Sequence, residues 1–188
     1  MIAAFVCSAV ASGASGIWLM AHSNIAVKNI AEKLADVGFD NWRLLVSDEF
    51  HCDWYGHLVL FQLCCADLLA RHSHLYQKVA KNVITSGEFK PKCLRGRLDG
   101  VPVMLSTLSM LSNPKIGLFT RVNPVRTVVV DEASQIPLGD YIAPLRTFPT
   151  IHKICMIGDD KQCESSVVAS ENWFLTSSTS ATIWCRPG

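Results

Sequence analysis

Two carboxylates directly after an apolar run are the residues of this chain best suited to chemistry. The run covers Thr127–Val130, and Asp131 and Glu132 follow it at once. Such a run is typical of a strand buried on both faces, which would carry both carboxylates to the carboxyl edge of a sheet. There an aspartate can hold a phosphate-bound Mg²⁺, and the adjacent glutamate can polarise an attacking water. A turn rich in acidic residues explains the pair equally well, so the surrounding sequence must decide.

A second apolar run also ends in carboxylates. Lys153–Ile157 is followed by the sequence Gly-Asp-Asp-Lys-Gln at positions 158–162. A Gly-Asp-Asp triplet is familiar from viral RNA polymerases, but that site needs an apolar strand on each side of a hairpin. Here the residues downstream of the triplet are polar. We therefore set the polymerase interpretation aside.

The elements before these runs predict a strand, a polar turn and an amphipathic helix. Residues 17–21 are an apolar run of strand length, and apolar side chains then recur at helical spacing from Val27 to Leu34. Between them, Ser23 or Asn24 is suited to cap the helix. A strand that leads through a polar turn into a helix is the repeating unit of α/β proteins.

The rest of the chain continues the alternation. We expect, in chain order, a strand at 42–46, a helix from Trp54 to about residue 69, a weak helix at 75–83, a strand at 101–105, helical turns at 107–111 and a helix at 139–148 interrupted by Pro144. This pattern predicts an α/β fold with a largely parallel sheet flanked by helices. From residue 163 no period is maintained, so we expect residues 163–188 to be a divergent, poorly ordered tail.

Composition narrows the class of protein. The chain has 188 residues, of which 49% are hydrophobic and 18% charged, which suits one domain and excludes a wholly disordered protein. The net charge of +1 means that any nucleic-acid binding must come from a local groove. No apolar run reaches the roughly 18 residues needed to cross a membrane, so we expect no membrane partner.

The cysteines indicate a reducing compartment. The sequence contains 8 of them with no Cys-x-x-Cys pair, and their spacing fits no common zinc pattern. We expect free thiols, no disulfide, and a cytoplasmic or nuclear location. The alternative is a secreted α/β domain, because Ile2–Ala11 has the length of a signal-peptide core, although no Lys or Arg precedes it and a buried helix fits equally well.

Four short segments in a fixed order form a pattern more specific than any one of them. They are Met20–Val27 with its Ser-Asn pair, Leu105–Leu108, Asp131–Gln135 and residues 158–162. They resemble, in turn, motif Ia, the strand whose threonine holds nucleic acid, motif II and motif III of superfamily 1 helicases, in the branch of nonsense-mediated-decay and senataxin-like enzymes. The resemblance implies an incomplete RecA-like P-loop NTPase domain, a partial first motor domain over residues 1–162.

The resemblance also implies ATP and Mg²⁺ as cofactors, with a role for each matching residue. Asp131 would coordinate Mg²⁺, and Glu132 would be the general base towards the water that attacks the γ-phosphate. Gln135 and Asp159 would lie near the nucleotide. Gln162 would sense the γ-phosphate and couple hydrolysis to movement of the bound nucleic acid.

Contacts with single-stranded RNA or DNA are implied at other positions. Ser23, Asn24 and Thr107 would touch the phosphate backbone through hydroxyl, amide and helix N-terminal N–H groups. For Ser23 and Asn24, a plain helix cap is an equally good explanation, and both can hold at once. Basic residues such as Lys28 and Arg97 are candidates for the same surface, although solvated faces explain them as well.

Phosphate binding is where the sequence departs from the family. These enzymes cradle the phosphates in a glycine-rich loop that ends in Gly-Lys-Ser/Thr. None of the 11 glycines here is followed by lysine. We therefore expect a fragment that begins just after its phosphate loop, lacks the second motor domain with its arginine finger, and is inactive by itself. The alternative is a non-catalytic module that uses a helicase-like fold to bind nucleic acid or a protein.

Overall fold

The computed structural model of the chain describes residues 1–54, 76–94, 96–158, 174–178 and 181–185. Its elements are α1 (Ile2–Ala11), β1 (Ile17–Ala21), α2 (Asn24–Asp36), β2 (Trp42–Val46), β3 (Val83–Thr85), η1 (Ser86–Glu88), α5 (Pro91–Leu94), β4 (Val103–Thr107), η2 (Leu108–Ser112), α6 (Gly117–Thr120), β5 (Thr127–Val130), η3 (Ala133–Gln135), α7 (Leu138–Thr147), β6 (Lys153–Ile157), β7 (Phe174–Ser178) and β8 (Ala181–Cys185), where η marks a short 3₁₀ helix. Residues 48–54 and 76–80 are also helical.

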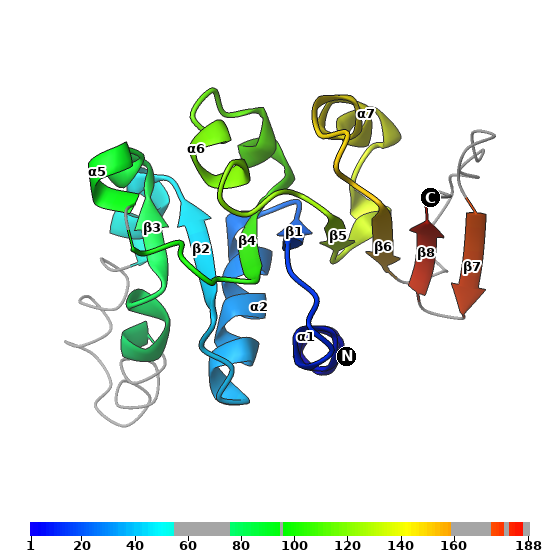
Figure 1. Cartoon of the computed structure of the whole chain (residues 1–188), viewed down its shortest axis with the longest axis horizontal. Helices are drawn as coiled ribbons and strands as arrows, with labels where there is room; N and C mark the ends of the chain where they lie inside the picture. The colour runs from blue at the N-terminus through cyan, green and yellow to red at the C-terminus, as the bar shows by residue number, and fades with distance from the viewer. Residues whose placement is uncertain (55–75, 95, 159–173, 179–180, 186–188) are drawn as a thin grey trace.

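One sheet organises the molecule (Figure 1). Its strand order is β3-β2-β4-β1-β5-β6-β8-β7, and the first six of these strands run parallel to one another. Helices cover both faces of the parallel part, α1 and α2 on one face and α6 and α7 on the other. This confirms the predicted α/β fold with a largely parallel sheet flanked by helices.

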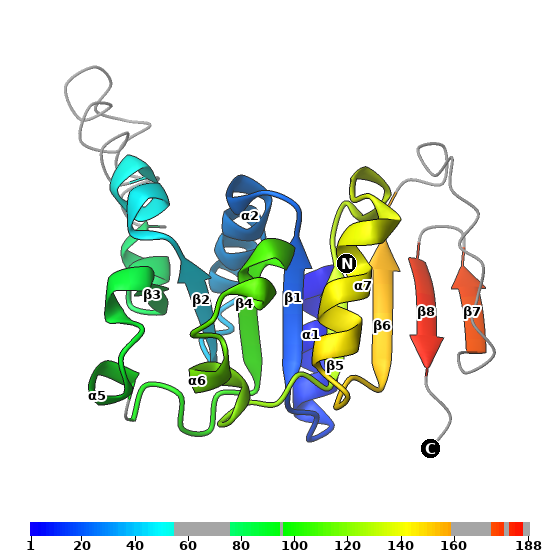
Figure 2. The same ribbon diagram turned by 90° about the horizontal axis from the view of Figure 1, so that it is seen from above.

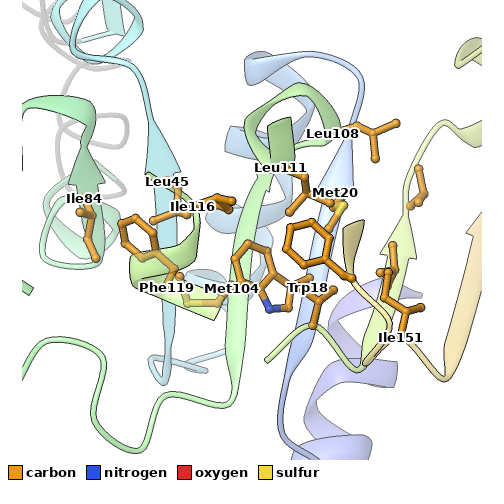
Figure 3. Packing of buried hydrophobic residues seen from close by; sticks show 14 of the residues in the cluster. Trp18, Met20, Leu45, Ile84, Met104, Leu108, Leu111, Ile116, Phe119 and Ile151 are labelled. Carbon is orange, nitrogen blue, oxygen red and sulfur yellow. The ribbon is translucent and has the colours of Figure 1, made fainter. Parts of the chain in front are cut away.

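Each face of the parallel sheet has its own hydrophobic core, because successive side chains of a strand point to opposite faces. Trp18 and Met20 of β1 belong to one core, which packs beneath η2, α6 and α7 and includes the fully buried Phe119 (Figure 3). Leu19 and Ala21 belong to the other core, which packs against α1 and α2. Every residue of β1 is buried, and β1 is the central strand of the fold because it lies between β4 and β5 in the middle of the sheet.

Prolines explain two differences from the predicted boundaries. The strand expected at 101–105 begins at Val103, after Pro102, which has no N–H to donate to a neighbouring strand. The carbonyl of Pro102 accepts the N–H of Ile17 at 3.0 Å. The helix expected to break at Pro144 continues to Thr147. Proline removes one helical hydrogen bond, but its own carbonyl still accepts the N–H of Phe148 at 3.0 Å.

Between β2 and β4, the observed elements differ from the predicted ones. The helix expected from Trp54 lies mostly outside the described residues, and the part that is described begins at residue 48, where the Ser47 hydroxyl accepts the N–H of Phe50 at 3.2 Å. The weak helix expected at 75–83 is present at 76–80. It is followed by β3, a three-residue strand that is too short for periodicity to reveal.

Two strands lie within the tail that we expected to be poorly ordered over residues 163–188. β7 and β8 pair antiparallel, and β8 also pairs antiparallel with β6 along the side that faces away from β5. The tail has no sustained hydrophobic period, which is why the sequence pattern did not reveal these strands. Backbone pairing supplies the hydrogen bonds of these strands, β8 with β6 and β7 with β8.

Free thiols were expected from the spacing of the cysteines. In the described part of the chain, Cys7, Cys52, Cys93 and Cys155 are free. Burial raises the pKa of the Cys155 thiol.

Among the helices that the structure describes, none has both the length and the apolar character needed to cross a membrane. Ile2–Ala11 forms α1, and its Val6 is buried in the second core.

Candidate functional site

The carboxyl ends of β4, β1 and β5 meet at one edge of the sheet (Figure 2). The strand register pairs Ala21 with Thr107 and Met20 with Val130. The N–H of Asp131 donates to the carbonyl of Met20 at 2.8 Å, so the segment after β5 starts beside the end of β1. The edge therefore gathers these sequence-predicted residues: Ser23, Asn24, Thr107, Asp131, Glu132 and Gln135.

Glu132 has an unusual backbone conformation. Its φ and ψ are 54° and 36°, in the left-handed region, and among the described residues it is the one non-glycine residue with a positive φ. Its N–H donates to Oδ1 of Asp131 at 3.2 Å. Residues outside glycine, asparagine and aspartate rarely adopt this conformation, and such strain concentrates at functional sites. The side chain of Glu132 is exposed, and its backbone is tied to the Asp131 carboxylate.

Replacing Glu132 with glycine should raise the free energy of unfolding by about 1 kcal/mol, because glycine adopts a positive φ without a steric cost. Denaturant unfolding of the purified chain measures this change. The matched control is Glu132→Ala, which removes the same carboxylate but keeps a Cβ, and it should give no stabilisation. Equal stabilisation by both variants would mean that the charge of Glu132, and not its backbone, is the destabilising feature.

The turn that follows Glu132 is held from two sides. The hydroxyl of Tyr141, on α7, donates to the carbonyl of Ala133 at 3.1 Å. At the end of β6, a Cβ on Gly158 would lie 3.3 Å from both the N and the Oγ of Ser134. A side chain at position 158 would therefore press on η3. These contacts fix the turn that carries Asp131 and Glu132.

Three further residues are predicted to lie near the nucleotide, and of these the structure describes Gln135. Gln135 ends η3 with an exposed side chain, and its N–H donates to the carbonyl of Glu132 at 2.9 Å. Asp159 and Gln162 lie outside the described residues. Their predicted roles near the nucleotide stay predictions.

The turn between β1 and α2 shows the capping predicted for it. Ser23 is the N-cap of α2, and its hydroxyl accepts the N–H of Ala26 at 3.1 Å. Asn24 is the first residue of the helix and is half-buried. Free N–H groups and the positive end of the helix dipole therefore face the same edge as Asp131. Such an end favours anionic groups, including phosphates.

Thr107, which is predicted to touch the backbone of a nucleic acid, is largely buried. Only 7% of the residue is exposed, and its hydroxyl lies 3.0 Å from the hydroxyl of Ser109. The neighbouring Ser106 is fully buried, and its hydroxyl has no hydrogen-bond partner in the described part of the chain. Ser109, by contrast, is exposed at this edge, and the role predicted for Thr107 stays a prediction.

Basic side chains near β2 and β3 are held by contacts within the protein. Lys28 lies 3.6 Å from Glu32 and 5.5 Å from the ring centroid of Trp54. Arg97 pairs with Glu88 at 2.7 Å. Burial and the charge of Arg97 lower the pKa of the Arg43 guanidinium, which donates to backbone carbonyls. These contacts favour a structural role for Lys28, Arg43 and Arg97.

Asp48 is a carboxylate of this edge that sequence reasoning did not single out. It follows β2, and Ser86, which follows β3, donates its hydroxyl to the carboxylate at 2.7 Å. Hydrogen bonds from the Thr85 side chain, the Ser86 side chain and the Gly87 backbone lower the pKa of Asp48. This carboxylate ties the helix at 48–54 to η1. The signal in the sequence was the Ser-Asp pair directly after the predicted strand at 42–46.

Comparisons with known proteins do not assign a family. The chain matches no protein-family model and no curated protein.

Proposed function

We propose that the chain is part of the first motor domain of a superfamily 1 helicase, a RecA-like domain that couples ATP hydrolysis to movement along single-stranded RNA or DNA. The observation that carries the proposal is the position of Asp131 and Glu132. They follow β5, which lies beside the central strand β1 in a parallel sheet, and Glu132 has a strained backbone. Open parallel sheets bind their ligands beyond the carboxyl ends of the strands.

The residues at this edge suit Mg²⁺ that arrives with a nucleotide. Mg²⁺ takes one or two carboxylates and completes its shell with phosphates and water. Asp131 supplies one carboxylate, and among the described residues no three metal-ligating side chains gather into a dedicated site. When bound, the ion neutralises charge on the phosphates. Glu132 would accept the proton of a water held beside it, and Gln135 would orient that water from the end of η3.

The sequence offers no matching cradle for the phosphates, because none of the 11 glycines is followed by lysine. Backbone N–H groups and the lysine of such a loop bind the β- and γ-phosphates in P-loop proteins. We therefore propose ATP hydrolysis as the activity of the family, and not of this chain by itself. The same observation favours the second candidate, a non-catalytic helicase-like module that binds nucleic acid or a protein.

The purified chain should show no ATP hydrolysis that nucleic acid stimulates. The reason is the lack of a phosphate cradle, and the measurement is phosphate release with and without single-stranded RNA and DNA. The control is the variant Glu132→Gln, which should behave like the wild-type chain. Clear turnover that Glu132→Gln abolishes would contradict this prediction and show that the chain hydrolyses ATP without the loop.

The variant Ser23→Asp should weaken binding of single-stranded RNA or DNA by about 10-fold, because it adds a charge that repels phosphates at the end of α2. Aspartate caps a helix as well as serine does, so the stability of the chain should not change. Fluorescence anisotropy with a labelled oligonucleotide at fixed salt measures the effect.

The matched control is Asn29→Asp, which adds the same charge at an exposed position further along α2. It should leave binding within about 2-fold of the wild-type value, since screening weakens the effect of distant exposed charges. Equal loss in both variants would indicate a non-specific effect of net charge. No loss in Ser23→Asp would remove the end of α2 from the proposed nucleic-acid surface.

A further inference from the structure

Around β5 and β6, the acidic and the basic side chains lie at opposite edges of the sheet. Between residues 117 and 158 the carboxylates are Asp131, Glu132 and Asp140. The first two follow β5 at the carboxyl edge, and Asp140 is in the first turn of α7, which begins there. The cations of this segment lie towards the opposite edge (Figure 2): Arg121 and Arg126 precede β5, Arg146 is in the last turn of α7, and Lys153 begins β6.

These two loops are far apart in sequence but adjacent in space. The carbonyl of Arg126 accepts the N–H of His152 at 2.8 Å and that of Lys153 at 3.2 Å. The hydroxyl of Thr150 donates to the carbonyl of Val125 at 2.8 Å. These loops, the last turn of α7 and the start of β6 form a surface, here called the basic loop surface, which consists of Arg121, Val122, Arg126, Arg146, His152 and Lys153.

The charges of the basic loop surface are available to a partner. All of its residues are exposed. The ion pairs that the structure describes are Lys28–Glu32, Lys81–Asp40 and Arg97–Glu88, and none of them includes a residue of this surface. Like charges gathered without counter-charges repel one another and create a positive potential that attracts an anionic partner.

The loop that enters β5 is held in place by buried hydrogen bonds. Asn123 is 5% exposed, and its amide donates to the carbonyl of Val101 at 2.8 Å. Its own carbonyl accepts the indole N–H of Trp18 at 3.3 Å. Arg121, Val122 and Arg126 are therefore presented from a fixed backbone, which reduces the entropy lost when a partner binds.

The chemistry of the surface favours a protein over a nucleic acid. Val122 is 51% exposed and lies between Arg121 and Arg126 in the sequence. Arginine next to an apolar residue is typical of protein interfaces, whereas single-stranded nucleic acid is bound with large aromatic side chains that stack on bases, and the basic loop surface has no Phe, Tyr or Trp. We infer that the basic loop surface docks an acidic protein segment that pairs carboxylates with its cations and covers Val122 with an apolar side chain.

The test measures binding of the full chain to a fluorescein-labelled peptide in which glutamates flank a central pair of leucines. We expect binding that weakens with salt and falls about 10-fold or more in the double variant Arg121→Glu/Arg126→Glu. Val122→Ser keeps the charge and should weaken binding about 5-fold. The matched control is Lys90→Glu/Lys92→Glu, an equal charge change at exposed positions near α5, which should bind within about 2-fold of wild type.

Three results would overturn the inference. The first is an equal loss of peptide binding in the matched control. The second is that the wild-type chain binds the acidic peptide no better than a peptide with glutamine in place of glutamate. The third is displacement of the peptide by a single-stranded RNA that binds the same surface more tightly. Circular dichroism of each variant confirms folding. The Ser23→Asp variant should bind the peptide normally, so failure here is distinguishable from failure of the proposed nucleic-acid site.

Discussion

Replacing Gly16 with alanine should lower the free energy of unfolding by about 3 to 4 kcal/mol, the sum of backbone strain and a steric clash. Gly16 enters β1 with a φ of +73°, and a Cβ there would collide with the carbonyl oxygen of Pro124. That carbonyl cannot retreat easily, because the next residues are fixed to Gly16 itself: the N–H of Arg126 donates to the Gly16 carbonyl at 2.9 Å. Denaturant unfolding of the purified variant measures the loss.

Gly13→Ala is the matched control for this prediction. Gly13 has a φ of +85°, but a Cβ there would have nothing within 4 Å. It should therefore show only the cost of the left-handed backbone, about 1 kcal/mol. Losses of equal size in both variants would contradict the clash with Pro124.

Replacing Trp18 with alanine should lower the free energy of unfolding by about 3 to 5 kcal/mol, the range for large aromatic side chains removed from a core. Trp18 is fully buried on the central strand β1. The substitution leaves a cavity beneath α6, and it also leaves the carbonyl of Asn123 without its indole donor. The same unfolding measurement applies. A domain of this size has a total stability of about 5 to 15 kcal/mol, so much of it would be lost.

Trp18→Phe separates the two contributions. Phenylalanine keeps an aromatic ring in the core but cannot donate to Asn123, so the loss should be about 1 to 2 kcal/mol. Hydrogen exchange should show faster opening of the loop at 121–126 in this variant, because the loop loses one of its buried bonds. A loss in Trp18→Ala no larger than that in Trp18→Phe would contradict the core role of Trp18.

Strands buried on both faces were the part of the fold that the sequence predicted best. The apolar runs at 17–21, 42–46, 127–130 and 153–157 coincide with β1, β2, β5 and β6. Such strands tolerate few polar residues, so their ends are visible in the sequence. β3 was missed because it has only 3 residues, and β7 and β8 were missed because the tail that contains them has no sustained apolar pattern and they depend on pairing with other strands.

For the candidate site, the sequence predicted residue types and their place at strand ends, but not their conformations. Asp131 and Ser23 are where the pattern put them, directly after β5 and β1. Nothing in the sequence indicated the positive φ of Glu132, because the following turn is held by Tyr141 of α7 and lies close to Gly158, which follows β6. The low exposure of Thr107 likewise depends on how η2 packs.

By itself the sequence determined the alternation of buried strands and amphipathic helices, and with it a parallel sheet whose carboxyl edge carries Asp131, Glu132 and Ser23. That information is local, since side-chain periodicity and capping act within a few residues. Only the tertiary structure decided the strand order, the strain at Glu132 and the basic loop surface. Those features need segments that are distant in sequence, such as residues 121–126 and 146–153, to be brought together, and long-range pairing of β5 with β6 is what joins them.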